Sequence, residues 1–378
     1  MPIITYLTHI RFGDGTLGEL PEDLAALGIR RPLVVTDKGI VAAGLVERLF
    51  DVVSSDNRRL VFDDVPTNPT EEAALQAVKL YRDEDCDGLI ALGGGSAIDL
   101  AKAVGLLATH PEPLSQYAMV EGGVARITPK VAPLVAIPTT SGTGSEVGRG
   151  SVMNLSDGRK LGIISPNLIP KRAICDPELT LGLPPWLTAA TGMDALSHCI
   201  ESFLTPNYNP PAEGIALDGA RRIVLHLERA VEDGQDREAR RELMAGAMEG
   251  GMTFQKGLGA VHALSHALGS LKEPRLHHGT LNAVLLPPVL RFNADHVGDK
   301  YRRLAQAMGF AADADLAAFI EDLNGRIGLP RSLKEMGVPA RVIPEMAAKA
   351  EKDHTNPTNP RKATAADYRR LLQESIAA

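Results

Sequence analysis

The sequence predicts an α/β domain built on a mostly parallel sheet, followed by an all-helical domain. Strand-like and helix-like segments alternate through the first half of the chain, which is typical of βαβ units. After the proline-rich stretch at 176–192, strand-like segments nearly vanish. The 378 residues are enough for two domains with substantial cores. We therefore predict an α/β domain over 1–182 and a helical domain over 183–378.

Short apolar runs rich in β-branched residues predict the strands, and helical spacing of apolar residues predicts the helices. In the first domain we expect strands at 32–36, 59–65, 87–96 (running into glycines) and 132–138, and helices at 38–53, 69–84 and 96–109. In the second we expect helices at 187–204, 212–232, 237–253, 257–271, 279–293, 297–308, 313–326, 330–336, 341–350 and 364–376. Because no flexible linker separates the two halves, we expect close packing and a ligand cleft between the domains.

Composition excludes several classes of partner. The net charge of −7 and the 4% of aromatic residues argue against a nucleic-acid surface. No run of 18 apolar residues is present, and the first residues lack the basic start and apolar core of a signal peptide, so we expect no membrane contact. The three cysteines are scattered, which fits a reducing compartment. We expect a cytoplasmic protein that binds small molecules.

A glycine turn links a buried strand to a helix at Leu89–Asp99, and it includes Gly93, Gly94, Gly95 and Ser96. Glycines let a ligand approach the backbone, and a helix N-terminus offers free N–H groups to a phosphate. The motif is not GxGxxG, and a plain strand-to-helix turn would look the same. It indicates a pyrophosphate site without establishing one.

A second polar loop follows the next strand at 137–146. It carries five hydroxyl side chains and two glycines, among them Thr139, Thr140 and Ser145. The alternative is a polar surface turn. Two such loops after successive strands support each other, because both would open at the carboxyl edge of one sheet.

Asp37 follows the strand at 32–36. A carboxylate at the end of a strand can accept both ribose hydroxyls of NAD and would repel a 2′-phosphate. It can equally cap the next helix. The sequence leaves these two interpretations open.

Asp194 and His198 lie four residues apart in a predicted helix and therefore on one face. His262 lies in a second predicted helix, and either His277 or His278 adds a third imidazole; spacing does not decide which. Such pairs are often structural, but burying so many polar groups without a ligand would be costly. One carboxylate and three imidazoles suit Fe(II) or Zn(II). Glu201 shares the Asp194 face and could support the ligands from behind. With the phosphate loops, this set predicts a metal-dependent dehydrogenase.

At these residues the chain resembles the iron-containing (group III) alcohol dehydrogenase family, nearly end to end. The motifs are GGGSAIDLAK (93–102), IPTTSGTGSEV (137–147), ATGMDALSHCIE (190–201), HALSHALG (262–269) and HHGTLNAVLLP (277–287). Within the family it is most similar to bacterial 4-hydroxybutyrate dehydrogenases. The resemblance implies the dehydroquinate synthase-like fold, with a dinucleotide-binding α/β domain, a helical domain, and a homodimer or larger homo-oligomer.

The resemblance also implies roles for individual residues. The metal ligands correspond to Asp194, His198, His262 and His278, and the proton relay corresponds to His266. The NAD(H) contacts correspond to Asp37, Gly94, Gly95, Ser96, Asp99, Thr139, Thr140, Ser145 and Lys160. Asn68 and Phe254 correspond to substrate-pocket positions.

These assignments imply reversible interconversion of a primary alcohol and an aldehyde, with the metal acting as a Lewis acid on the substrate oxygen. A 4-hydroxybutyrate substrate needs a cation for its carboxylate. We choose Arg149, because it alone adjoins a cofactor loop; the other candidates are Lys256, Arg275, Arg361 and Lys362, and any of them could be a solvated surface charge. The alternatives are a dehydrogenase for neutral alcohols, a related metal- and NAD-dependent cyclase or lyase, and a non-enzymatic metal or nucleotide sensor.

Overall fold

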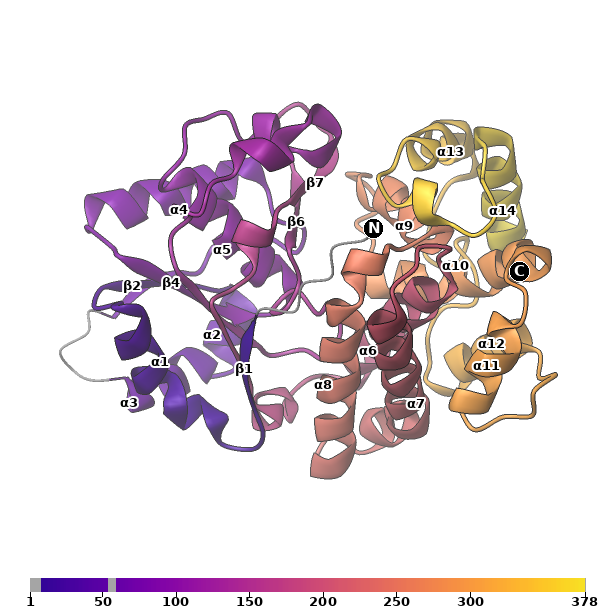
Figure 1. Ribbon diagram of the computed structural model, residues 1–378, viewed down its shortest axis with the longest axis horizontal. Helices are drawn as coiled ribbons and strands as arrows, with labels where there is room; N and C mark the ends of the chain where they lie inside the picture. Colours follow the sequence, from indigo (N-terminus) through magenta and orange to yellow (C-terminus); the bar gives the residue numbers. More distant parts are fainter. Residues whose placement is uncertain (1–7, 54–58, 378) are drawn as a thin grey trace. The chain divides into compact units, whose positions relative to one another are not determined.

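The computed structural model describes residues 8–53 and 59–377, which form two compact units (Figure 1). An α/β unit comprises 8–140 and 145–182. A helical unit comprises 183–377 together with the short segment Ser141–Gly144. Among the described residues, no helix is both long and apolar enough to cross a membrane.

The α/β unit is built on a six-stranded sheet in which every neighbouring pair is parallel, so the predicted fold class is confirmed. The strand order is β1-β8-β5-β4-β2-β3. The strands are β1 (His9–Phe12), β2 (Pro32–Val35), β3 (Leu60–Phe62), β4 (Gly88–Gly93), β5 (Leu134–Pro138) and β8 (Arg172–Cys175). The central strands are apolar at every position because both faces of a parallel sheet are covered.

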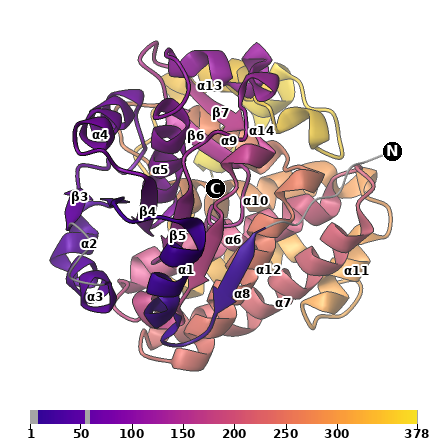
Figure 2. The same cartoon turned by 60° about the vertical axis from the view of Figure 1, so that its left-hand side comes forward.

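Helices cover the two faces of this sheet. α4 (Glu71–Asp83) and α5 (Gly95–Leu107) pack on the face that carries Leu33 and Val35. α1 (Leu20–Leu27) and α3 (Leu45–Val52) pack on the opposite face, which carries Val34 (Figure 2). Because β2, β4 and β5 are parallel neighbours, their carboxyl ends lie at the same edge of the sheet. The two glycine-containing loops leave the sheet at this edge, after β4 and β5.

The structure adds strands that the sequence did not indicate. β1 and β8 contain only four residues each, and β6 (Gly150–Asn154) pairs antiparallel with β7 (Lys160–Ile164) in a separate hairpin. The helix expected at 38–53 is two helices, α2 (Lys38–Ala42) and α3, because Gly44 between them adopts a left-handed backbone with φ of 74°.

The described residues 183–377 are helical and contain no strand. The helices are α6 (Pro185–Leu204), α7 (Pro210–Glu232), α8 (Arg237–Met252), α9 (Ala260–Gly269), α10 (His278–Asn293), α11 (Lys300–Ala307), α12 (Leu316–Arg326), α13 (Ile343–Glu351) and α14 (Ala365–Ala377). The helix expected at 330–336 is wrong. That segment forms turns, because the Leu333 N–H donates to the Ser375 carbonyl of α14 rather than to a local carbonyl.

Lys256 is buried at the C-terminal end of α6. Its Nζ donates to the carbonyls of Ser202 (2.9 Å), Phe203 (3.1 Å) and Thr205 (2.7 Å), which are among the last carbonyls of a helix and lack partners within it. Burial, with the neighbouring Lys300 ammonium, lowers the pKa of Lys256 to about 7. Because its ammonium donates to these carbonyls, Lys256 is not available to bind a substrate carboxylate.

We predict that Lys256→Met lowers the free energy of unfolding by about 2 kcal/mol, because buried carbonyls lose a charged donor. Urea unfolding of both variants checks this. The control is Lys79→Met, which removes an exposed lysine on α4 and should change stability by less than about 0.5 kcal/mol. Equal stabilities for the two variants would contradict the capping role.

Candidate metal centre and dinucleotide-binding loops

Four side chains from three helices of the helical unit meet at one buried point. Asp194 Oδ1, on α6, lies 3.5 Å from His198 Nε2, 3.9 Å from His262 Nε2 and 3.6 Å from His278 Nε2. One donor atom from each of the four residues lies within 4.8 Å of the others. The structure therefore brings together the four predicted ligands.

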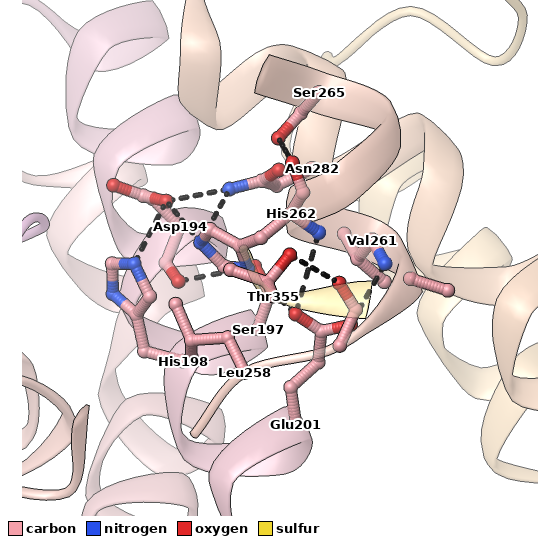
Figure 3. Close-up of polar contacts among 12 residues, drawn as sticks. Asp194, Ser197, His198, Glu201, Leu258, Val261, His262, Ser265, Asn282 and Thr355 are labelled. Carbon is pink, nitrogen blue, oxygen red and sulfur yellow. Dashed lines mark hydrogen bonds and ion pairs between the residues drawn. The ribbon is translucent and has the colours of Figure 1, made fainter. Parts of the chain in front are cut away.

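Glu201 holds His262 from the side away from this point. Its Oε2 accepts from His262 Nδ1 at 2.6 Å, and its Oε1 accepts from the Val261 N–H at 2.8 Å (Figure 3). Because Nδ1 carries the proton, the lone pair of His262 is on Nε2, the atom nearer Asp194. Glu201 thus fixes both the tautomer of this candidate ligand and the start of α9.

Asn282 on α10 also reaches this point. Its Nδ2 donates to Asp194 Oδ1 at 2.7 Å and lies 3.3 Å from His262 Nε2 (Figure 3). The same nitrogen lies 3.2 Å from His278 Nε2. The amide therefore contacts three of the four candidate ligands. Asn282 stands in the motif HHGTLNAVLLP, but an asparagine in a predicted helix gives no sign of this role in the sequence.

The donor set fits a divalent transition metal. Ligand atoms about 2.1 Å from an ion in a tetrahedral arrangement lie about 3.4 Å from one another, close to the 3.5, 3.6 and 3.9 Å separations from Asp194 Oδ1. Burial lowers the pKa of His198 to about 4, so its imidazole is neutral and able to donate a lone pair. A cation bound here would also compensate the buried carboxylate of Asp194.

The adjacent histidines His277 and His278 have different surroundings. His278 begins α10 and joins the cluster, whereas His277 precedes the helix and packs edge-on against Trp186, with ring centroids 5.7 Å apart. Phe254, a predicted substrate-pocket residue, packs edge-on against His198 at 4.7 Å. It therefore places an apolar ring directly beside the candidate centre.

His266, the predicted proton relay, lies one turn after His262 on α9. Its ring is 5.8 Å from that of His262 and nearly parallel to that of His278 at 5.6 Å. Its Nδ1 is 3.0 Å from Asp353 Oδ2. The sequence analysis did not single out Asp353, which is 87 residues away along the chain.

In the α/β unit, the predicted phosphate loop begins α5. Gly94 precedes the helix, and a methyl group on it would lie 3.3 Å from Thr140 Oγ1. A methyl group on Gly93 would lie 2.8 Å from Ala97 Cβ and 3.7 Å from Asp37 Oδ2. Three predicted cofactor contacts, Asp37, Gly94 and Thr140, therefore lie around one closely packed turn, where glycine lets neighbouring groups approach the backbone.

Asp37 also caps α2. Its Oδ1 accepts from the N–H groups of Gly39 (2.8 Å) and Ile40 (3.1 Å). Its Oδ2 is the oxygen that faces the Gly93 turn. The two interpretations left open by the sequence are therefore compatible, because each uses a different oxygen.

Asp99 and Ser145 are hydrogen-bonded to each other. Ser145 Oγ donates to Asp99 Oδ1 at 2.6 Å and accepts from Lys102 Nζ at 2.8 Å. Lys102 is buried and also donates to the carbonyls of Gly148 (2.9 Å) and Gly150 (2.7 Å). This network fixes the end of the second loop. Direct cofactor contact by Asp99 and Ser145 stays a prediction.

The remaining predicted contacts also lie in the α/β unit. Lys160 Nζ donates to Asn68 Oδ1 at 3.1 Å, which brings together a predicted cofactor residue and a predicted substrate residue. The hydroxyl of Ser96 on α5 donates to the Thr67 carbonyl. Gly95 is the first residue of α5, and Thr139 follows β5 with a buried hydroxyl that has no hydrogen-bond partner among the described residues.

Comparison with known proteins identifies the family. Residues 8–177 match the family model described as iron-containing alcohol dehydrogenase, and 188–376 match the C-terminal model of the Fe-containing alcohol dehydrogenase family. The chain belongs to the iron-containing alcohol dehydrogenase family, as the motifs predict.

Among its relatives, a 4-hydroxybutyrate dehydrogenase of Cupriavidus necator is 55% identical, with 100% of both chains covered. A 1,3-propanediol dehydrogenase of Citrobacter freundii is 36% identical, over 97% of this chain and 96% of the relative. The crystal structure of a 1,3-propanediol oxidoreductase superposes with a TM-score of 0.92 at 34% identity, covering 99% of this chain and 100% of the other. A sulfoacetaldehyde reductase from Bifidobacterium kashiwanohense, solved in complex with NAD+, gives 0.90 at 29% identity, covering 100% and 99%.

We predict that Glu201→Gln weakens metal binding by about 10- to 100-fold, the usual effect of losing a carboxylate behind a metal-binding histidine. The Gln carbonyl would accept from Val261, leaving its NH2 group facing His262 Nδ1 and favouring the wrong tautomer. Competition with a chelating dye measures the affinity. Glu238→Gln, at an exposed carboxylate on α8, is the control. Unchanged affinity in Glu201→Gln would refute the orienting role.

We also predict that Gly279→Ala disrupts the centre through packing alone. A methyl group there would lie 2.1 Å from the Ala190 carbonyl oxygen, so α10 must move off α6 and carry His278 away from Asp194. Overpacking costs about 1–3 kcal/mol, and metal content after dialysis should fall below one ion per chain. The control is Gly214→Ala on α7, where a methyl group meets nothing within 4 Å. Full metal content in Gly279→Ala would contradict the prediction.

Proposed function

We propose that the protein is an NAD-dependent, metal-dependent dehydrogenase that interconverts 4-hydroxybutyrate and succinate semialdehyde. The observation that carries this proposal is the 55% identity, over the full length of both chains, to a 4-hydroxybutyrate dehydrogenase. The ligand cluster in the helical unit and the glycine turn at the start of α5 in the α/β unit support it. We further propose that the protein works in the cytoplasm as a homodimer or larger homo-oligomer, with 1–182 binding the cofactor and 183–378 the metal and substrate.

Asp194, His198, His262 and His278 would hold Fe(II), and the same donors also accept Zn(II). A bound ion would polarise the substrate oxygen, and a bound nicotinamide would accept or return hydride. Glu201 keeps the His262 lone pair on Nε2 for this task. Phe254 excludes water beside His198. His266 takes the hydroxyl proton during alcohol oxidation and returns it during aldehyde reduction.

The cofactor would lie against the turn formed by Gly93, Gly94 and Gly95. The free N–H groups at the start of α5 would bind its pyrophosphate. Asp37 Oδ2 would accept from the ribose hydroxyls, which favours NAD over its 2′-phosphorylated form. Thr139, Thr140 and Lys160 would supply the remaining polar contacts.

Arg149 would bind the substrate carboxylate. Its side chain is partly buried, and burial lowers the pKa of its guanidinium. Across 8–53 and 59–377, this guanidinium has no carboxylate or carbonyl partner. Arg361, by contrast, donates to the Phe292 carbonyl at 3.2 Å and lies over that residue's ring. A desolvated cation without a partner is suited to receiving an anion.

We predict that Arg149→Gln lowers kcat/KM for succinate semialdehyde by about 10- to 150-fold, because a charge-assisted hydrogen bond is worth about 1.5–3 kcal/mol. The rate with butanal, which has no carboxylate, should stay within about twofold of wild type. NADH oxidation by Fe(II)-loaded protein measures both. Arg302→Gln, at an exposed arginine of α11, is the control.

Two other outcomes are informative. Equal loss with both aldehydes would show that Arg149 does not recognise the carboxylate. Equal wild-type rates with both aldehydes would favour a dehydrogenase for neutral alcohols, in line with the 36% identity to a 1,3-propanediol dehydrogenase.

A further inference from the structure

A carboxylate from the C-terminal part of the helical unit is held against His266. Asp353 follows α13, and its Oδ2 lies 3.0 Å from His266 Nδ1. The two side chains are about nine-tenths buried, with exposed fractions of 11% and 10%. A short, largely desolvated contact of this kind has a strong orienting effect on an imidazole.

Thr355 fixes the orientation of that carboxylate. Its backbone N–H donates to Asp353 Oδ1 at 2.9 Å, and its hydroxyl lies 2.7 Å from the same oxygen. Because Oδ1 is occupied by these contacts, Oδ2 is the oxygen that remains for His266. The carboxylate therefore cannot rotate without losing the Thr355 N–H bond.

The same segment is tied to the beginning of α9. The Thr355 hydroxyl lies 3.0 Å from the Gly259 carbonyl, and the Thr358 hydroxyl donates to the Leu258 carbonyl at 2.6 Å. Asn359 Oδ1 accepts from the Ala260 N–H at 3.0 Å. These hydrogen bonds hold the loop at 353–359 against the start of α9, the helix that carries His266. They therefore keep Asp353 beside His266.

We propose that Asp353 is a positioning residue that keeps His266 in the tautomer protonated at Nδ1, so that Nε2 is the nitrogen that exchanges the substrate proton. This rests on the proposed function. In alcohol oxidation the substrate O–H bond breaks and an N–H bond forms at Nε2, while the electron pair of the C–H bond leaves as hydride to NAD+. The resulting imidazolium keeps its other proton on Nδ1 and donates it to Asp353 Oδ2, and the negative charge of this carboxylate stabilises the imidazolium.

Asp353→Asn tests this, because Thr355 dictates how the new amide lies. The Thr355 N–H needs an acceptor, so the Asn carbonyl oxygen takes the Oδ1 position and the NH2 group faces His266 Nδ1. His266 Nδ1 must then accept, and its proton moves to Nε2. We expect kcat to fall by about 10²- to 10⁴-fold, the usual contribution of a positioned acid–base group, with KM and metal content unchanged.

The decisive readout is the ¹⁵N NMR spectrum of histidine-labelled, Zn(II)-loaded protein, which needs no substrate. Wild type should show His266 protonated at Nδ1, and Asp353→Asn should show it protonated at Nε2; His266→Gln assigns the signal. Asp353→Glu keeps two acceptor oxygens and should keep the wild-type tautomer. Glu345→Gln, at an exposed carboxylate of α13, removes the same charge elsewhere and should change nothing.

Other outcomes would overturn the proposal. One is an Asp353→Asn variant that retains the Nδ1 tautomer and wild-type kcat. Another is loss of the single bound metal in that variant, which would make Asp353 structural. A third is two ions per wild-type chain and one in Asp353→Asn, because His266, Asp353 and His354 also place donor atoms within 4.8 Å of one another. If wild type reduces no aldehyde, the proposed function fails, and the NMR result still decides the tautomer.

Discussion

The helical unit is organised around the burial of one carboxylate. Asp194 is 3% exposed and has three imidazole nitrogens within 3.9 Å of its Oδ1. A buried negative charge is costly unless a cation or strong donors compensate for it. The donors present, chiefly the Asn282 amide, satisfy one oxygen only in part. A cation bound at this point would compensate that charge, and the packing of α6, α9 and α10 holds the four candidate donor atoms within 4.8 Å of one another.

Close packing behind the ligands depends on glycine. On α8, a methyl group at Gly250 would lie 3.2 Å from His198 Cβ, and one at Gly246 would lie 2.7 Å from the Ile223 side chain. A methyl group at Gly219 on α7 would lie 2.8 Å from Cys199 Sγ. The absence of side chains at these positions lets α7 and α8 approach α6, and this approach packs the backbone of α8 directly behind His198.

Local periodicity was enough to predict the helices and the pairing of Asp194 with His198, because a helix places residues four apart on one face. It was also enough for the parallel sheet. It did not predict the short strands β1 and β8, whose four residues carry little pattern, nor the break at Gly44. Neither Asn282 nor Asp353 was identified, because their roles come from contacts 88 and 87 residues away along the chain. Spacing did not decide between His277 and His278, whereas the resemblance to the family implied His278, the histidine that lies in the cluster.

Two histidines on α9 are each oriented by a contact between Nδ1 and a carboxylate oxygen. Glu201, from α6, accepts from His262 Nδ1, and Asp353, from the loop after α13, lies against His266 Nδ1. In both cases a carboxylate that is itself bonded to backbone N–H groups leaves Nε2 as the basic nitrogen. Because the two residues are one turn apart, a single helix presents one lone pair suited to a metal and another suited to a proton. Each imidazole is oriented by its own carboxylate, so a substitution at Glu201 or Asp353 changes one contact and leaves the other in place.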